Sequence, residues 1–120
     1  MVAPVIRRFT ATISALNTSV NAVDNETNLT YIHVSGKNQI LDVVNDPDPA
    51  SGNRYVIAVY KGGRDTGVRF YSSSMSAGSA GRVAVGPIDL LGGDYQFRVT
   101  QVAGTAADFS FIVKFLAPPQ

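Results

Sequence analysis

The chain has 120 residues, of which 45% are hydrophobic and 16% charged, and its formal net charge is +1. This length predicts a single domain over residues 1–120, and so balanced a charge excludes a surface built to neutralise nucleic-acid phosphates. The absence of cysteine excludes disulfides, thiolate metal sites and cysteine nucleophiles.

The side chains favour β-structure. Valine, isoleucine, threonine, tyrosine and phenylalanine supply 41 residues, whereas leucine, methionine, glutamate, lysine and glutamine supply 16. Branched and aromatic residues suit a pleated sheet, and straight-chain helix formers are scarce. We therefore predict an all-β fold, a single antiparallel β-sandwich of about eight strands, with jelly-roll and immunoglobulin-like topologies both open. Residues 1–4 and 117–120 are expected to form extended N- and C-terminal arms.

The first half of the chain carries three predicted strands and one shorter one. Residues 5–14 alternate between apolar and polar side chains, which predicts a half-buried strand. Small and polar residues over 15–28 predict a long loop with one short strand. Two more strand-like segments, 29–35 and 39–44, flank Gly36-Lys37-Asn38, which we expect to close a hairpin. A run of proline, aspartate and asparagine then predicts an exposed loop before Arg54.

The second half predicts two hairpins. Residues 54–60 and 68–72 should form the first, followed by a small-residue surface loop over 72–81 and a short strand over 82–85. The strongest alternation lies in residues 95–115, where apolar side chains occupy every second position on both sides of a linker. We expect this segment to form the central hairpin of the core.

One tripeptide resembles catalytic machinery. Asp65-Thr66-Gly67 has the composition of the loop that supplies the paired carboxylates of aspartic proteases, one from each of two subunits. That family has an apolar strand before the motif, whereas Lys61-Gly-Gly-Arg64 precedes it here. We interpret the tripeptide as turn residues and expect no enzymatic activity. A retropepsin-like protease is the third functional alternative.

Metal sites have little support in the sequence. Asp42, Asp46 and Asp48 offer oxygen ligands suited to calcium, but their spacing fails the EF-hand pattern, so calcium binding by this loop is left open. His33 is the single histidine and lies in an alternating segment, which indicates a structural role. No cofactor and no metal are expected.

Nucleic acid is not expected as a partner. Basic and aromatic residues are interleaved in Arg69-Phe70-Tyr71 and at Phe97 and Arg98, a pattern that can stack single strands. Alternation sends neighbouring side chains to opposite faces, and nearby aspartates dilute the charge. The pairs Gly62-Gly63 and Gly92-Gly93 lack the ending of a phosphate-binding loop, and we expect both to be turns.

The sparse chemistry favours a protein that binds and assembles. The start of the chain lacks the apolar core of a signal peptide, and no run approaches a membrane span, so we expect synthesis in a cytoplasm. For the virus-particle protein hypothesised next, that cytoplasm is the host's and the final location is the virion. The leading hypothesis is a non-enzymatic structural protein of a virus particle, a bacteriophage capsid decoration or cement protein or a small coat subunit. It would dock on other protein subunits, capsid proteins or symmetry mates, as a homo-oligomer or part of a large assembly. The candidate interface residues are Val5, Ile6, Arg7, Arg8, Phe9, Leu116, Pro118 and Pro119.

The second hypothesis is a stand-alone carbohydrate-binding or adhesion module. Its binding platforms would be Tyr31, Tyr60 and Tyr71, whose rings can pack on a sugar. A planar row of exposed rings would support this function, and buried rings would count against it. The identity of the partner, the oligomeric state and the strand order stay open.

Overall fold

The fold is described for residues 5–46, 48–74 and 88–119 of a computed structural model. These ranges contain eight strands and no α-helix, which confirms the all-β antiparallel prediction. The expected arm over 1–4, the strand over 82–85 and most of the loop over 72–81 lie outside the described residues. The elements are β1 (Val5–Ala11), β2 (Ser19–Asn21), β3 (Val23–Asp24), β4 (Ile32–Asn45), β5 (Arg54–Lys61), β6 (Arg64–Tyr71), a 3₁₀ turn η1 (Ser72–Ser74), β7 (Ile88–Ala103) and β8 (Phe109–Phe115).

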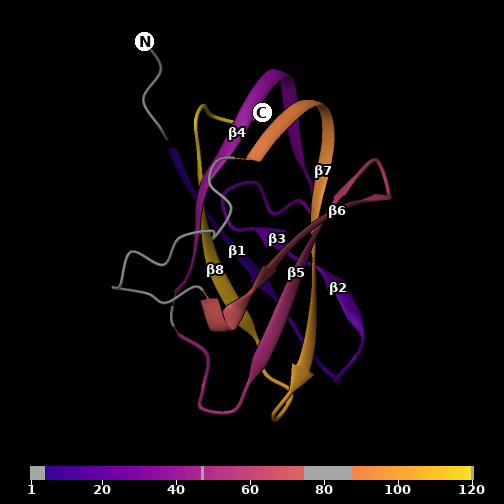
Figure 1. Cartoon of the computed structure of the whole chain (residues 1–120), viewed down its shortest axis with the longest axis vertical. Helices are drawn as coiled ribbons and strands as arrows, with labels where there is room; N and C mark the ends of the chain where they lie inside the picture. The colour runs from indigo at the N-terminus through magenta and orange to yellow at the C-terminus, as the bar shows by residue number, and fades with distance from the viewer. Residues whose placement is uncertain (1–4, 47, 75–87, 120) are drawn as a thin grey trace.

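All eight strands belong to one antiparallel sheet (Figure 1). Its order is β3-β1-β8-β4-β7-β5-β6, and β2 also pairs with β7. The longest strands are β4 and β7, and each pairs with different neighbours along its length. Residues 32–40 of β4 pair with β7, whereas residues 40–45 pair with β8. The sheet folds over along these two strands, so β1 and β8 face β5 and β7 across a common core.

Glycines allow β4 and β7 to bend together, as their shared arch in Figure 1 shows. The register of β4 on β7 shifts between Val34 and Lys37, and Gly36 inside this irregularity has φ +82°. Gly92 lies opposite, where a Cβ would stand only 3.4 Å from the Gly36 nitrogen, and Gly93 has φ +148°. Positive φ and close backbone approach both favour glycine. The hairpin predicted at Gly36 and the turn predicted at Gly92-Gly93 are therefore wrong, because both sites lie inside continuous strands.

The central hairpin predicted from residues 95–115 is also wrong. No pairing joins β7 to β8; instead β8 lies between β1 and β4, and β7 lies between β4 and β5. The two strands face each other across the core, with the ring centroids of Phe97 and Phe111 6.1 Å apart. The linker crosses between the layers because Gly104 takes φ +93° and the Gln101 amide nitrogen donates to two linker carbonyl oxygens.

Aromatic rings fill the space between the two layers. Phe9 of β1 lies 4.9 Å from Phe97 of β7 and 5.6 Å from Phe111 of β8, measured between ring centroids. Tyr55 of β5 stacks on Phe109 of β8 at 4.2 Å. Each of these five side chains is at most 2% exposed. The alternation read from the sequence explains this burial, because every second side chain of a strand points to the same face.

The first residue of the predicted small-residue loop is part of the fold. The Ser72 hydroxyl oxygen accepts the Tyr55 N–H at 2.9 Å, and the Ser72 carbonyl oxygen accepts a hydrogen bond from the Asn45 amide at 2.9 Å. Ser72 is buried by these contacts. The surface loop expected over 72–81 therefore does not begin at Ser72.

The segment after β8 is fastened to its own domain. The Leu116 N–H donates to a carbonyl oxygen of β4, and the Asn38 side chain forms two hydrogen bonds with the backbone of Ala117, at 2.8 and 3.0 Å. Pro119 is buried, and its carbonyl oxygen accepts a hydrogen bond from Arg7 at 3.1 Å. The described part of the predicted C-terminal arm thus runs along the domain rather than away from it.

Candidate functional site

The interface residues predicted in β1 divide between the two sides of the sheet. Phe9 is 1% exposed and belongs to the core, and Arg7 points to the same side. Ile6 is 63% exposed and Arg8 is exposed on the opposite side. Alternation makes this division unavoidable, because a contiguous strand cannot present all its side chains to one partner. Phe9 therefore offers no surface for docking.

The two arginines of β1 stabilise the fold through ion pairs. Arg7 Nη1 lies 2.6 Å from Oδ2 of Asp24, whose side chain is fully buried, and Arg7 Nε lies 2.8 Å from Oε2 of the exposed Glu26. Asp24 Oδ1 also accepts the Glu26 N–H at 2.9 Å. Arg8 Nη2 lies 2.5 Å from Oδ2 of Asp46 on the outer side. These contacts connect β1 to the segment around β3 and to the loop after β4.

The outer edge of β1 is only partly covered. Its pairing with β3 involves Phe9 and Thr10, and no other described strand pairs with that edge. The Arg8 carbonyl oxygen faces the β3 side, where it accepts the Asn25 N–H. Backbone groups of alternate residues point the same way, so those of Ile6 also face this edge. Uncovered strand edges are places where another chain can add a strand.

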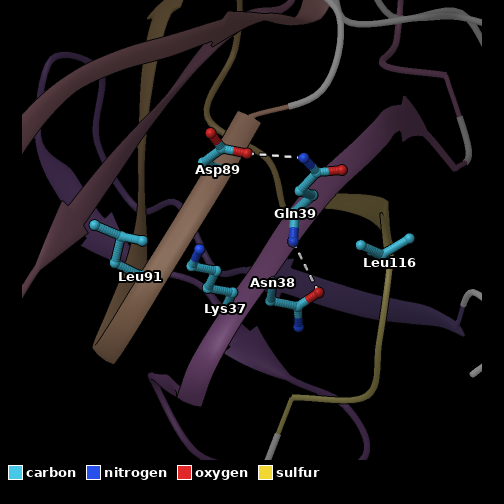
Figure 2. A pocket seen from close by; sticks show the side chains of 6 residues that line it. All are labelled: Lys37, Asn38, Gln39, Asp89, Leu91 and Leu116. Carbon is cyan, nitrogen blue, oxygen red and sulfur yellow. Dashed lines mark hydrogen bonds between the residues drawn. The ribbon is translucent and has the colours of Figure 1, made fainter.

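A hollow of about 350 Å³ opens on the outer side of β4 (Figure 2). Alternation places Lys37 and Gln39 of β4 on this side, opposite Leu91 and Asp89 of β7. The Gln39 amide donates to Asp89 Oδ1 at 2.8 Å. Leu91 and Leu116 flank the hollow with 56% and 42% of their side chains exposed. The lining residues are Lys37, Asn38, Gln39, Asp89, Leu91 and Leu116.

The hollow and the exposed end of β1 lie on one surface. Ile6 is in register with Lys114 of β8, and Val5 is in register with Phe115, so Leu116 follows at the same end of the strands. Three exposed apolar side chains, from β1, β7 and the segment after β8, therefore occupy the same side of the sheet. We call this area the β4 outer surface, comprising Ile6, Lys37, Gln39, Asp89, Leu91, Lys114 and Leu116.

Sequence reasoning found part of this surface. It selected Ile6 and Leu116 but missed Lys37 and Leu91. Leu90 is buried and Leu91 is exposed. Because both residues are leucine, the sequence does not show which of them points outward until the inward face of β7 is known.

The tripeptide Asp65-Thr66-Gly67 lies in β6, after the β5–β6 hairpin that closes at Gly62-Gly63 as predicted. Asp65 Oδ1 accepts the Gly67 N–H at 2.8 Å, and both carboxylate oxygens of Asp65 are bound by the Arg69 guanidinium, at 2.8 and 2.5 Å. A protease dyad requires two carboxyl groups that share a proton. Here the carboxylate shapes an irregularity within an edge strand. The prediction that the tripeptide forms the hairpin turn is wrong, because the turn already closes at Gly62-Gly63.

We expect Asp65 to titrate far below an ordinary aspartate. The hydrogen bonds from Arg69 and then from the Gly67 N–H hold its pKa at about 2, against an ordinary value of 3.8. A lowered pKa in the folded state means that this contribution to stability is present above pH 3.8 and is lost as the pH falls through about 2. Carbon-13 NMR titration of the side chain measures the value directly. In Arg69→Gln the pKa of Asp65 should move towards 3.8; an unchanged value would show that Arg69 is not the cause.

Of the other candidate ligands, His33 and Asp46 each contact a partner side chain. His33 is exposed, with Nδ1 2.7 Å from Oδ1 of Asp94 on the neighbouring strand. Asp46 pairs with an arginine of β1, Asp42 lies opposite a lysine of β8, and Asp48 lies in the loop after β4. Within the described ranges, no group of three or more metal-ligating side chains comes together.

The tyrosines proposed as sugar platforms come from separate segments. Tyr31 precedes β4, Tyr60 lies in β5 and Tyr71 ends β6. The Arg98 guanidinium covers the Tyr60 ring, with its carbon 4.1 Å from the ring centroid. A sugar cannot stack on that covered side of Tyr60, whereas Tyr31 and Tyr71 are 40% and 52% exposed.

Comparison with known proteins gives no family assignment. No family model matches the sequence. The comparison with curated proteins likewise finds no significant match. In the part of the chain that the structure describes, no helix has the length and hydropathy needed to cross a bilayer.

Proposed function

We propose that this protein is a non-enzymatic structural subunit that docks on other protein subunits, as a capsid decoration protein or a small coat subunit of a virus particle. The observation that carries the proposal is the β4 outer surface. Leu91 and Leu116, exposed by 56% and 42%, flank one hollow, and Ile6, exposed by 63%, lies on the same side of the sheet. Scattered exposed apolar residues are ordinary, whereas apolar side chains gathered around a concavity are typical of interaction sites.

The docking mechanism uses side chains and backbone together. Leu91 and Leu116 would lose their contact with water against a partner, and the backbone of Ile6 would accept an added strand at the uncovered edge. Each contact is modest by itself. Repetition over many copies on a shell converts modest affinity into high avidity.

A sugar-binding module is the weaker candidate. The stack of Arg98 on Tyr60 and the separate origins of the tyrosines do not favour it. The retropepsin-like protease is not favoured either, because the Asp65 carboxylate is bound by Arg69 instead of sharing a proton with a second carboxyl group.

The test is co-sedimentation with purified particles of the virus that encodes the chain. We expect the wild-type chain to sediment with the particles in many copies, and Ile6→Asp/Leu116→Asp to lose at least about nine tenths of that association, because burying two unpaired carboxylates is costly. Val102→Asp is the matched control, since Val102 is 44% exposed but lies outside the β4 outer surface. Circular dichroism should show all three chains folded.

Two results would contradict the proposal. A wild-type chain that stays in the supernatant would exclude the virion role. A double variant that sediments like the wild type would exclude the β4 outer surface as the docking site.

A further inference from the structure

The hollow of the β4 outer surface has an apolar rim and contains one positive and one negative side chain. Figure 2 shows Leu91 and Leu116 on opposite sides, with Lys37 beside Leu91 and Asp89 beside Gln39. A concave site flanked by exposed leucines is suited to a bulky apolar side chain, because filling it removes both leucines from water.

The two charged side chains of the hollow, Lys37 and Asp89, differ in their hydrogen bonding. Asp89 Oδ1 already accepts a hydrogen bond from the Gln39 amide at 2.8 Å. Lys37 is exposed and forms no ion pair with any residue in the described ranges. Asp89 likewise forms no ion pair within the described ranges, but Lys37 also lacks a described side-chain hydrogen bond, and a carboxylate is the complement of this cation.

We propose that the hollow receives a bulky apolar side chain of a partner polypeptide whose neighbouring acidic residue pairs with Lys37. This inference rests on the proposed docking function and specifies the chemistry of the partner. The apolar side chain would contact Leu91 and Leu116, and the carboxylate would fix its orientation. A backbone or amide N–H of the same segment would reach the second oxygen of Asp89, which has no hydrogen bond within the described residues.

A peptide titration tests this recognition on the isolated chain. The probe is the blocked dipeptide N-acetyl-Glu-Leu-amide, followed by ¹⁵N–¹H NMR, and the comparison is N-acetyl-Lys-Leu-amide. We expect saturable shifts at residues 37–39, 89–91 and 116, and an affinity about fivefold higher for the acidic probe. Lys37→Glu should reverse the order of the two probes, and Leu91→Ser should weaken both by about fivefold. Val102→Ser, a truncation on another surface, should change neither.

The outcomes separate this inference from the docking function. Absent or non-saturating shifts, equal affinities for the two probes, or an unchanged order in Lys37→Glu would each overturn it. If the chain then still sedimented with particles, docking would stand without this mode of recognition. Peptide binding with no particle association would instead retain the recognition and refute the virion role.

Discussion

Replacing Phe111 with alanine is expected to lower the free energy of unfolding by about 3–5 kcal/mol. Phe111 is fully buried, and its ring lies 5.6 Å from Phe9, 6.1 Å from Phe97 and 5.5 Å from Phe109, measured between centroids. Like Phe9, it contacts rings in both layers of the folded sheet. The truncation would remove contacts in each layer and leave a cavity between them.

Urea unfolding followed by far-ultraviolet circular dichroism measures this loss. Phe111→Leu is the matched variant and should cost clearly less, because it retains most of the apolar volume. Ile112→Ala changes the adjacent, half-buried residue and should also cost less. A loss below about 1 kcal/mol for Phe111→Ala would mean that the two layers do not depend on this ring.

Replacing Arg7 with methionine is expected to have the second largest effect, a loss of about 3–5 kcal/mol. Asp24 is fully buried, and Arg7 is its cationic partner at 2.6 Å. Without Arg7 the carboxylate would keep only the N–H of Glu26. The substitution also removes the hydrogen bond to Pro119, so the C-terminal segment would lose an attachment.

A double-mutant comparison separates charge burial from general disruption. Adding Asp24→Asn to Arg7→Met removes the unpaired charge and should restore part of the stability. Glu26→Gln should cost no more than about 1 kcal/mol, because the Glu26 side chain is 67% exposed. If Arg7→Met cost no more than Glu26→Gln, the buried pair would not be a determinant of the fold.

The sequence predicted the inward faces of strands better than their partners. Phe9, Tyr55 and Phe109 are buried as the alternation indicated, because alternation is a property of the strand itself. Pairing depends on residues far away in the chain. The alternating segments of β7 and β8 looked like a hairpin because they are neighbours in sequence, yet their aromatic faces pack against each other from opposite layers.

Glycine was the main source of error at strand boundaries. Gly62-Gly63 forms a turn, whereas Gly36 and Gly92 lie within strands that bend, although Gly36 and Gly62 both stand beside a lysine. The difference lies in the partner strand, which continues past Gly36 and Gly92 but ends at the β5–β6 turn. The residues around a glycine do not show which strand pairs with it, so they do not predict whether it forms a turn or a bend. The same holds for Leu91, whose exposure depends on how β7 sits on β4.

The pairing of β1 determines when the sheet can be completed during synthesis. Along its whole length β1 pairs with β8, which is made about 100 residues later. Ribosomes add about 5–20 residues per second, so the first strand waits roughly 5–20 s for this partner. Until then β3, two residues long, is the one described strand that can pair with it, and the apolar side of β1 has no finished core to enter. Folding of the complete sheet is thus expected to follow translation of β8, and a nascent chain truncated before Phe109 should remain sensitive to protease.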